Sequence, residues 1–228
     1  MAPIVWKVSQ VSQPPVEPGS PAGEHMTTLT TAPAGRIQLR RADALLIVDV
    51  QNDFVPGGSL AVPRGDEIVP VVNRYIEAFD AAGLPVFATR DWHPADHCSF
   101  KAQGGSWPSH CVAGTPGAAF ARTLMLPESA TIVSKATERA RDAYSGFAGT
   151  ELEAKLRRIG ALQLFVGGLA TDYCVLSTVR DARALGFGVM LLTDAIRAVD
   201  VRQGDGARAE AEMLALGARP MALDRLSV

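Results

Sequence analysis

Residues 44–50 read ALLIVDV, an apolar run of strand length with an aspartate near its end. Its apolar residues do not alternate with polar ones, which is typical of a strand that is buried on both faces of a parallel sheet. Further short apolar runs follow along the chain, at 85–89, 131–135, 162–167, 189–194 and 220–223. The sequence therefore predicts a six-stranded sheet in which most neighbouring strands are parallel.

Segments of helical character separate most of these strands. They lie at 66–82, 149–159, 172–185 and 204–216, and each is followed by a glycine where a helix commonly ends. Helices that alternate with parallel strands cover both faces of the sheet. We therefore expect an α/β protein with three layers, α/β/α, and a Rossmann-like topology.

The composition limits the classes of function. Lys and Arg number 22 and Asp and Glu 24, so the chain has no excess of basic side chains with which to neutralise phosphate groups. Nucleic acid and anionic membranes are therefore not expected as partners, whereas a small molecule is. No apolar run approaches the roughly 20 residues of a membrane span, and the first residues do not resemble a secretion signal. Three cysteines are too few for a disulfide framework, so we expect a cytoplasmic protein.

Residues 1–40 are rich in Pro, Gly, Ser and Thr and have little periodic apolar content. Such segments bury too little apolar surface to offset the entropy of ordering them, so we expect a disordered N-terminal tail. Met26 lies within it and leaves open whether translation starts at Met1 or at Met26. Residues 41–228 are expected to form one domain.

Polar side chains stand at the carboxyl ends of the expected strands. Asp49 lies at the end of the first strand, Asp91 comes after the second, Lys135 ends the third, and Cys174 comes just after the fourth. These ends meet at one edge of a parallel sheet, where ligands bind. A cysteine at a helix start lies near the positive end of the helix dipole, which favours the thiolate. A lone cysteine is more often a packed core residue, but Asp49 as a base and Lys135 as a cation would make this one a nucleophile.

A long irregular segment at 91–127 interrupts the alternation and holds three of the four histidines of the chain. One carboxylate and three imidazoles in this segment suit a divalent transition metal, Zn²⁺ before Fe²⁺ or Mn²⁺. The candidate ligands are Asp91, His93, His97 and His110. Other donors adjoin them and remain alternatives, namely Asp96, Cys98 and Cys111.

Several motifs resemble those of one known family: IVDVQNDF, DWHPADH, WPSHCVAGTPGAAF, DAYSGF and GLATDYCV. Together they are similar to the nicotinamidase branch of the isochorismatase-like cysteine hydrolases, which includes the bacterial pyrazinamidases. The resemblance covers about residues 44–223 and does not include the N-terminal segment. It implies the isochorismatase-like version of the three-layer fold.

The resemblance also implies a role for each motif. Asp49, Lys135 and Cys174 would form a catalytic triad, and Asp91, His93, His97 and His110 would bind one divalent metal ion. A cis peptide bond would join Leu169 to Ala170 and would orient the backbone amides of Ala170 and Cys174 as an oxyanion hole. The substrate pocket would be lined by Phe54, Trp107 and Tyr144, although each aromatic residue taken alone is typical of a core position.

By the same resemblance, the chain would be a nicotinamidase that converts nicotinamide into nicotinic acid and ammonia in NAD salvage, and pyrazinamide into pyrazinoic acid. The alternatives are an amidase for another small amide, an isochorismate-type hydrolase, a catalytically silent homologue that binds a metal or a ligand, and a protein whose metal is structural. The sequence does not rank nicotinamide against pyrazinamide, and it leaves the metal and the state of homo-oligomerisation open.

Overall fold

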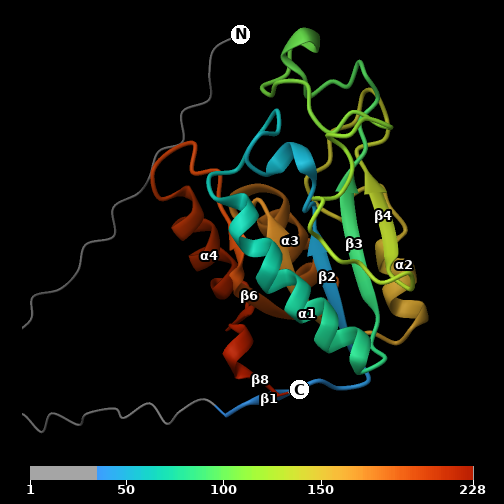
Figure 1. The fold of residues 1–228 in the computed structure, drawn as a ribbon, viewed down its shortest axis with the longest axis vertical. Helices are drawn as coiled ribbons and strands as arrows, with labels where there is room; N and C mark the ends of the chain where they lie inside the picture. Colours follow the sequence, from blue (N-terminus) through green and yellow to red (C-terminus); the bar gives the residue numbers. More distant parts are fainter. Residues whose placement is uncertain (1–34, 228) are drawn as a thin grey trace, which may run out of the picture. The chain divides into compact units, whose positions relative to one another are not determined.

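A computed structural model of the chain describes residues 35–227 (Figure 1). Its main sheet has six strands in the order β4-β3-β2-β5-β6-β7, and the neighbouring strands are parallel. The strands are β2 (Asp43–Val48), β3 (Val86–Asp91), β4 (Thr131–Lys135), β5 (Gln163–Leu169), β6 (Gly188–Arg197) and β7 (Arg219–Met221). The predicted sheet is confirmed, and its strand pairs are all parallel.

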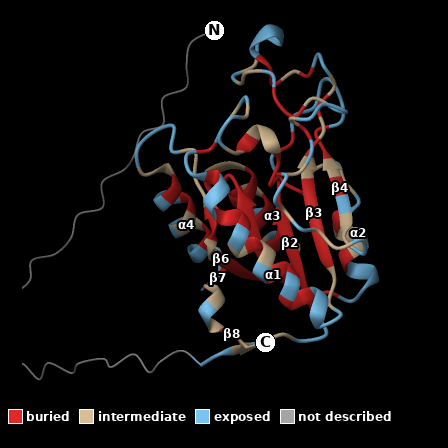
Figure 2. Cartoon of the chain, viewed as in Figure 1, coloured by how far each residue is buried: buried red, intermediate tan, exposed pale blue. Residues whose placement is uncertain are grey.

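Helices cover both faces of this sheet (Figures 1 and 2). They are α1 (Val69–Ala81), α2 (Leu152–Arg158), α3 (Leu176–Ala184) and α4 (Asp205–Ala215). On β2, Leu45 and Ile47 pack with α1, whereas the alternate side chains of Ala44, Leu46 and Val48 pack with the other helices. Both faces of β2 are therefore apolar, and the three-layer arrangement is confirmed. Within the described part of the chain, no helix is long and apolar enough to cross a membrane.

The ends of α1 and α3 agree with the sequence-based prediction, whereas the start of α3 does not. Gly83 follows α1 and Gly186 follows α3, with φ of 64° and 86°, in the left-handed region that glycine adopts without a steric penalty. The helix expected from residue 172 begins instead as a turn of π-helix over Thr171–Val175, and α3 starts only at Leu176. Such wide turns frequently occur at functional sites.

A small second sheet lies outside the predicted elements. Its strands are β1 (Ile37–Gln38) and β8 (Leu226–Ser227), which are parallel. Ile37 and Leu39 are partly buried and pack against the core around α1. The described fold therefore includes β1, which lies just before the expected tail boundary at residue 40. The remainder of the expected tail, residues 1–34, lies outside the described residues.

A chain that begins at Gly35 is expected to keep the melting temperature and the activity of the full chain, because 1–34 has the composition of a segment that buries little apolar surface. A chain that begins at Arg41 loses β1 and the core contacts of Ile37 and Leu39. Its melting temperature should fall by roughly 2–8 °C, for a loss of about 1–2 kcal/mol. Thermal melts of the full chain and of the chains starting at Gly35 and Arg41 measure both differences in melting temperature. Equal melts for the chains starting at Gly35 and Arg41 would show that β1 contributes nothing.

Candidate active site

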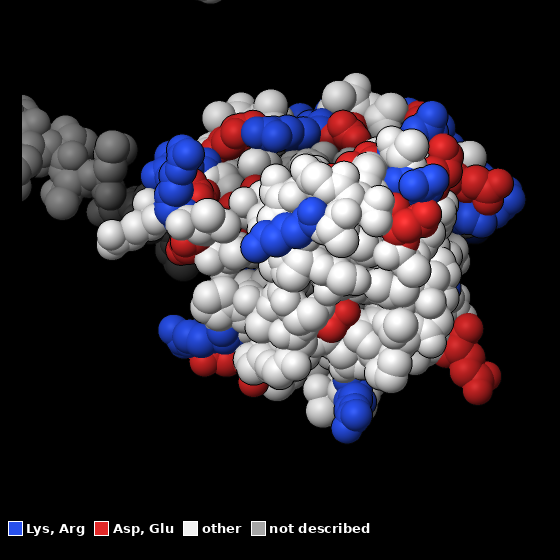
Figure 3. Space-filling model, turned by 90° about the horizontal axis from the view of Figure 1, so that it is seen from above, with Lys and Arg blue, Asp and Glu red and all other residues white. Residues whose placement is uncertain are grey.

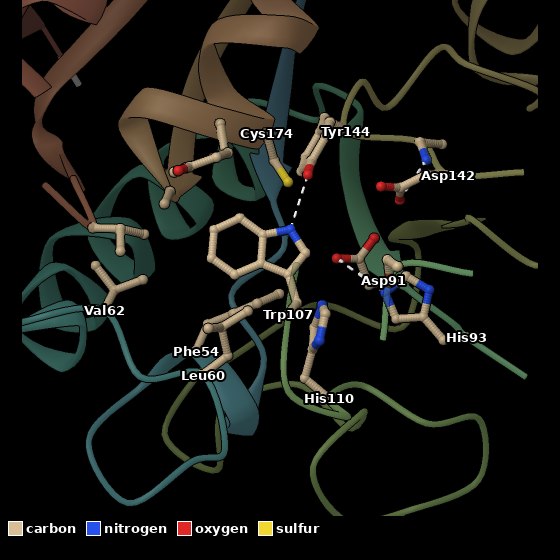
Figure 4. Close-up of a pocket in the computed structure, with 15 residues that line it drawn as sticks. Phe54, Leu60, Val62, Asp91, His93, Trp107, His110, Asp142, Tyr144 and Cys174 are labelled. Atoms are coloured by element: carbon tan, nitrogen blue, oxygen red, sulfur yellow. Dashed lines mark hydrogen bonds and ion pairs between the residues drawn. The ribbon is translucent and has the colours of Figure 1, made fainter. Parts of the chain in front are cut away.

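Side chains from four neighbouring strands meet at one edge of the sheet. Asp91 and Lys135 end β3 and β4 and are directly paired in the register. Asp49 comes one residue after β2, and Cys174 lies in the π-turn that follows β5. Since β4, β3, β2 and β5 are consecutive in the sheet, all four side chains reach the same end of it. Figure 4 shows Cys174 and Asp91 facing one pocket.

The backbone at Asp49 turns its carboxylate into this end of the sheet. Its φ of 48° lies in the left-handed region, which Asp and Asn adopt more readily than most residues do. Atom Oδ1 accepts a hydrogen bond from the Thr89 hydroxyl at 2.7 Å. Atom Oδ2 forms an ion pair with Lys135 at 2.9 Å but accepts no hydrogen bond from the residues that the structure describes. The carboxylate is thus fixed through one oxygen and has the other available as a proton acceptor.

The Lys135 ammonium is the centre of the buried cluster. Its Nζ lies 2.9 Å from Asp49 Oδ2, 2.5 Å from Asp91 Oδ1 and 3.5 Å from the Cys174 sulfur. It also donates a hydrogen bond to the Ala143 carbonyl at 3.0 Å. Burial by itself would lower the pKa of Lys135, but the two carboxylates raise it well above its usual value. Lys135 therefore remains a cation and joins the two aspartates to the thiol.

The two aspartates share the Lys135 cation, but their pKa values shift in opposite directions. Burial raises the pKa of Asp49 above the usual range of an aspartate, and the attraction of Lys135 offsets this only in part. Burial would also raise the pKa of Asp91, but there Lys135 and His93 prevail and lower it. A carboxylate with a raised pKa is the better proton acceptor. Of the two carboxylates, Asp49 is therefore the one suited to accept a proton, whereas Asp91 keeps its negative charge.

The Cys174 thiol differs from the sequence-based expectation in its acidity. Burial raises its pKa well above the usual value, and the nearby Lys135 cation offsets this only in part. The thiol is therefore protonated at rest, and formation of a thiolate requires a neighbouring base such as Asp49.

The chain between β5 and the π-turn has the geometry that the resemblance implied. The peptide bond between Leu169 and Ala170 is cis. The Ala170 carbonyl then accepts hydrogen bonds from the N–H groups of Tyr173 and Val175, both at 3.1 Å. These two bonds hold the backbone on either side of Cys174. The preceding Gly168 is required by packing, since a Cβ there would lie 2.0 Å from the Val48 carbonyl oxygen.

Three of the four predicted metal ligands lie together. Asp91, His93 and His110 each offer an atom within 4.8 Å of the others, and all three are buried. Nδ1 of His93 contacts the Ala136 carbonyl at 3.3 Å, and Nδ1 of His110 contacts the Pro108 carbonyl at 2.8 Å. A carbonyl only accepts hydrogen bonds, so each Nδ1 carries the proton and each Nε2 presents a lone pair. His93 Nε2 is buried with no hydrogen-bond partner among the described residues, so these side chains fit a divalent metal.

The structure does not bring His97 into this group as a fourth ligand. Its Nδ1 lies 2.8 Å from the Ser99 hydroxyl and its Nε2 lies 3.0 Å from the Arg141 carbonyl, so both ring nitrogens are engaged. Its ring packs against that of His93, with centroids 4.2 Å apart. The other donors adjacent in sequence also lie outside the group: Asp96 pairs with Arg139, and Cys98 and Cys111 are free thiols.

Substitutions of the two histidines should therefore have different effects. His110→Ala is expected to weaken zinc binding on the order of 100-fold or more, because it removes one of the three converging lone pairs. His97→Ala is expected to change it less than about 10-fold, since it removes a ring that packs against His93 but presents no free nitrogen. Competition with a chromogenic chelator measures both constants. If the two variants lost zinc affinity equally, His97 would be a metal ligand after all.

The pocket next to these side chains is small, with a cavity volume of about 40 Å³, and it is partly open to solvent. The predicted aromatic residues Phe54, Trp107 and Tyr144 all line it. The Trp107 indole N–H donates a hydrogen bond to the Tyr144 hydroxyl at 2.9 Å (Figure 4). Asp91, His93 and His110 line the same pocket as Cys174, so the metal group and the thiol face a common space.

Other parts of the pocket wall were not predicted from the sequence. They include Leu60, Val62, Ser99, Asp142, Ala143, Tyr173 and Val199. Tyr173 packs against Trp107 with ring centroids 5.1 Å apart, and its place beside Cys174 was the available signal. Val199 belongs to the loop after β6, which is held by the Asp172 carboxylate through the backbone N–H groups of Val199 and Asp200, both at 2.9 Å. No local sequence pattern shows such a long-range contact.

The face of the molecule seen from above carries both signs of charge. Lys and Arg side chains lie beside Asp and Glu side chains at several places on this face, with uncharged surface between them (Figure 3). Ion pairs between exposed side chains of the chain include Arg139 with Asp96 and Arg141 with Glu138. A small uncharged ligand meets no barrier of a single sign on this face.

Comparison with known proteins places the chain in a family. The model of the isochorismatase domain matches residues 43–224. The chain therefore belongs to the isochorismatase family, in agreement with its parallel sheet and its cysteine after β5.

Within this family, the similar proteins include nicotinamidases and pyrazinamidases. The nicotinamidase of Escherichia coli (strain K12) is 42% identical over 196 residues, which cover 77% of this chain and 92% of that protein. The zinc complex of the pyrazinamidase of Pyrococcus horikoshii has a TM-score of 0.77 at 48% identity and covers 80% of this chain and 99% of that one. PnC1 of L. infantum in complex with nicotinate has a TM-score of 0.78 at 35% identity, with coverage of 84% and 98%.

Proposed function

We propose that this protein is a metal-dependent nicotinamidase, a cysteine amidohydrolase that converts nicotinamide into nicotinic acid and ammonia. One observation carries the proposal: the Lys135 ammonium contacts Asp49, Asp91 and Cys174 together, and so joins a nucleophile and its base to the metal group beside the pocket that Cys174 and Asp91 line. The nicotinamidase of E. coli and the nicotinate complex of PnC1 support this substrate class. Pyrazinamide, which also combines a ring nitrogen with a carboxamide, is proposed as a second substrate.

The buried cluster around Lys135 is proposed to carry out the reaction. Asp49 takes the thiol proton of Cys174, and the thiolate attacks the carboxamide carbon. The backbone N–H groups of Ala170 and Cys174 are proposed to stabilise the oxyanion, and stabilisation of this kind commonly contributes most to the catalysis of acyl transfer. The C–N bond breaks as the amide nitrogen takes the proton back from Asp49 and leaves as ammonia. Water then hydrolyses the thioester, giving its proton to Asp49 and returning the thiol.

Asp91, His93 and His110 are proposed to hold the metal ion. When bound, a divalent ion such as Zn²⁺ would supply a Lewis acid for the ring nitrogen of the substrate, and so would orient the carboxamide toward Cys174. Phe54, Trp107 and Tyr144 line the pocket and would contact the faces of a flat aromatic ring. Zinc is favoured by the zinc complex of the related pyrazinamidase, and the same donors suit Fe²⁺ and Mn²⁺.

The test is ammonia release from a panel of amides, with metal content measured on the same sample. Nicotinamide and pyrazinamide should be hydrolysed, whereas benzamide, which has the same shape but no ring nitrogen, should be turned over at least about 100-fold more slowly. Chelation should abolish turnover of nicotinamide, and added zinc should restore it. Full activity of a demonstrably metal-free preparation would contradict the proposed role of the metal.

The same experiment separates the alternatives. A catalytically silent homologue would bind metal and release no ammonia from any amide. An amidase for a different small amide would hydrolyse another member of the panel in preference to nicotinamide. If the metal were only structural, chelation would lower the melting temperature in proportion to the loss of activity.

A further inference from the structure

The side chain of Gln51 makes an unusual set of contacts beneath the pocket. It is fully buried, and its amide contacts the backbone of Asp91 twice: Nε2 donates to the Asp91 carbonyl at 2.8 Å, and Oε1 accepts from the Asp91 N–H at 2.8 Å. Nε2 also donates to the Ala118 carbonyl at 2.9 Å. The Gln51 amide therefore makes three hydrogen bonds to backbone groups, two of them to Asp91.

The end of β2 explains why an amide is needed there. The backbone of β2 pairs with β3 as far as Ile47 and Ala88, and the Asp49 N–H still donates to the Thr89 carbonyl at 3.2 Å. The left-handed conformation of Asp49 then takes the chain out of the sheet. Asp91 lies two residues beyond Thr89, so its N–H and C=O point toward the same side, where no strand follows. The Gln51 amide supplies the donor and the acceptor that the next residue of a strand would supply.

Asp91 is thereby held on both sides at the position where its carboxylate acts. On one side it pairs in register with Lys135 of β4, and on the other it is bound by Gln51. Its carboxylate meets the Lys135 ammonium through Oδ1 and lies 3.7 Å from His93 Nε2 through Oδ2. The contact of Gln51 with Ala118 also ties in the segment that follows His110.

We propose that Gln51 is a positioning residue that fixes Asp91 for metal binding by substituting for a strand at the end of β2. It acts through Asp91, since the hydrogen bonds of its amide go to the backbone of Asp91 and Ala118. The inference rests on the proposed function, in which Asp91 is a metal ligand. Residues that orient metal ligands typically contribute 10- to 100-fold to metal affinity.

The experiment compares Gln51→Met with a matched amide elsewhere. Gln51→Met keeps the length of the side chain and removes all three hydrogen bonds. Asn73 is the control, because its amide also bridges two backbone groups, donating to the Thr123 carbonyl at 2.8 Å and accepting from the Met125 N–H at 2.9 Å, away from the pocket. The zinc dissociation constant of each folded protein is measured by competition with a chelator, together with kcat and KM for nicotinamide.

Gln51→Met is expected to bind zinc about 10- to 100-fold more weakly, with a matching loss of kcat/KM at limiting zinc, whereas Asn73→Leu should change neither by more than about twofold. If Gln51→Met does not fold, Gln51→Asn takes its place, because it keeps a polar amide in the buried position but is one methylene too short to reach both groups of Asp91. The same loss of affinity is expected from it.

A folded Gln51 variant that binds zinc as tightly as the wild-type protein would overturn this inference. That result leaves the proposed function standing, provided that the wild-type protein binds zinc and releases ammonia from nicotinamide. A wild-type protein that binds no zinc would overturn the proposed metal site and this inference together. If Asn73→Leu lost as much zinc affinity as the Gln51 variant, general destabilisation would explain the loss in both proteins. That result would also contradict the role of Gln51.

Discussion

Cys174→Ala is expected to lower the turnover of nicotinamide by at least about 1,000-fold while leaving the fold and the zinc content unchanged. The sulfur lies in the pocket, 3.5 Å from the Lys135 ammonium, and it is the atom that would form the acyl intermediate. Its removal adds no charge and creates only a small void, because the alanine keeps the Cβ that packs beside α3. The loss should therefore be confined to kcat, as measured by ammonia release.

Cys98 provides the control for this substitution. It is a free, half-buried thiol in the segment of the metal group and does not line the pocket in the described part of the chain. Cys98→Ala should keep activity within about twofold of the wild-type value. Intact-protein mass spectrometry with a slowly hydrolysed amide should detect a thioester, and peptide mapping should place it at Cys174. An adduct at Cys98 or Cys111, or near-normal activity of Cys174→Ala, would refute the mechanism.

Much of the fold could be predicted because its elements have local signals. A strand buried on both faces, such as 44–48, is apolar throughout, and a helix that ends at a glycine in the left-handed region has a fixed position in the sequence. The pair β1 and β8 has no such signal, since each strand has only two residues and they lie at opposite ends of the described chain. A pairing of that kind is decided by the docking of Ile37 and Leu39 on the core.

The site residues also fall into those that the sequence could predict and those that it could not. Asp49, Asp91 and Lys135 could be placed together because the carboxyl ends of adjacent parallel strands converge. The metal group was predicted from residue type and spacing, which do not distinguish a ligand from a neighbour. His97 has the right type and spacing, but its nitrogens are engaged by Ser99 and by a carbonyl 44 residues away. The acidity of Cys174 was also misjudged, because burial depends on the whole fold and outweighs the local effect of a helix start.

Asp49→Asn is expected to lower kcat by about 100- to 1,000-fold, nearly as much as loss of the thiol. The thiol is protonated at rest because burial raises its pKa, so the reaction needs a base. Among the described residues, Asp49 Oδ2 is a buried carboxylate oxygen that accepts no hydrogen bond. It lies close to the Cys174 sulfur, in the cluster of Asp49, Asp91 and Cys174. An asparagine keeps the shape of Asp49 but cannot take up a proton, and its amide nitrogen would face the Lys135 ammonium if Oδ1 kept its bond from Thr89.

Thr89→Val separates the proton transfer from the placement of the carboxylate. It removes the 2.7 Å hydrogen bond to Asp49 Oδ1 at nearly constant volume and leaves the carboxylate and its ion pair with Lys135 in place. If Asp49 acts as the base, Thr89→Val should lose less than about 10-fold in kcat, whereas Asp49→Asn should lose far more with zinc still bound. Ammonia release at saturating nicotinamide, zinc content and a thermal melt of each variant make the comparison. An Asp49→Asn protein that is folded, holds zinc and retains more than a tenth of the wild-type kcat would show that another group takes the proton of Cys174.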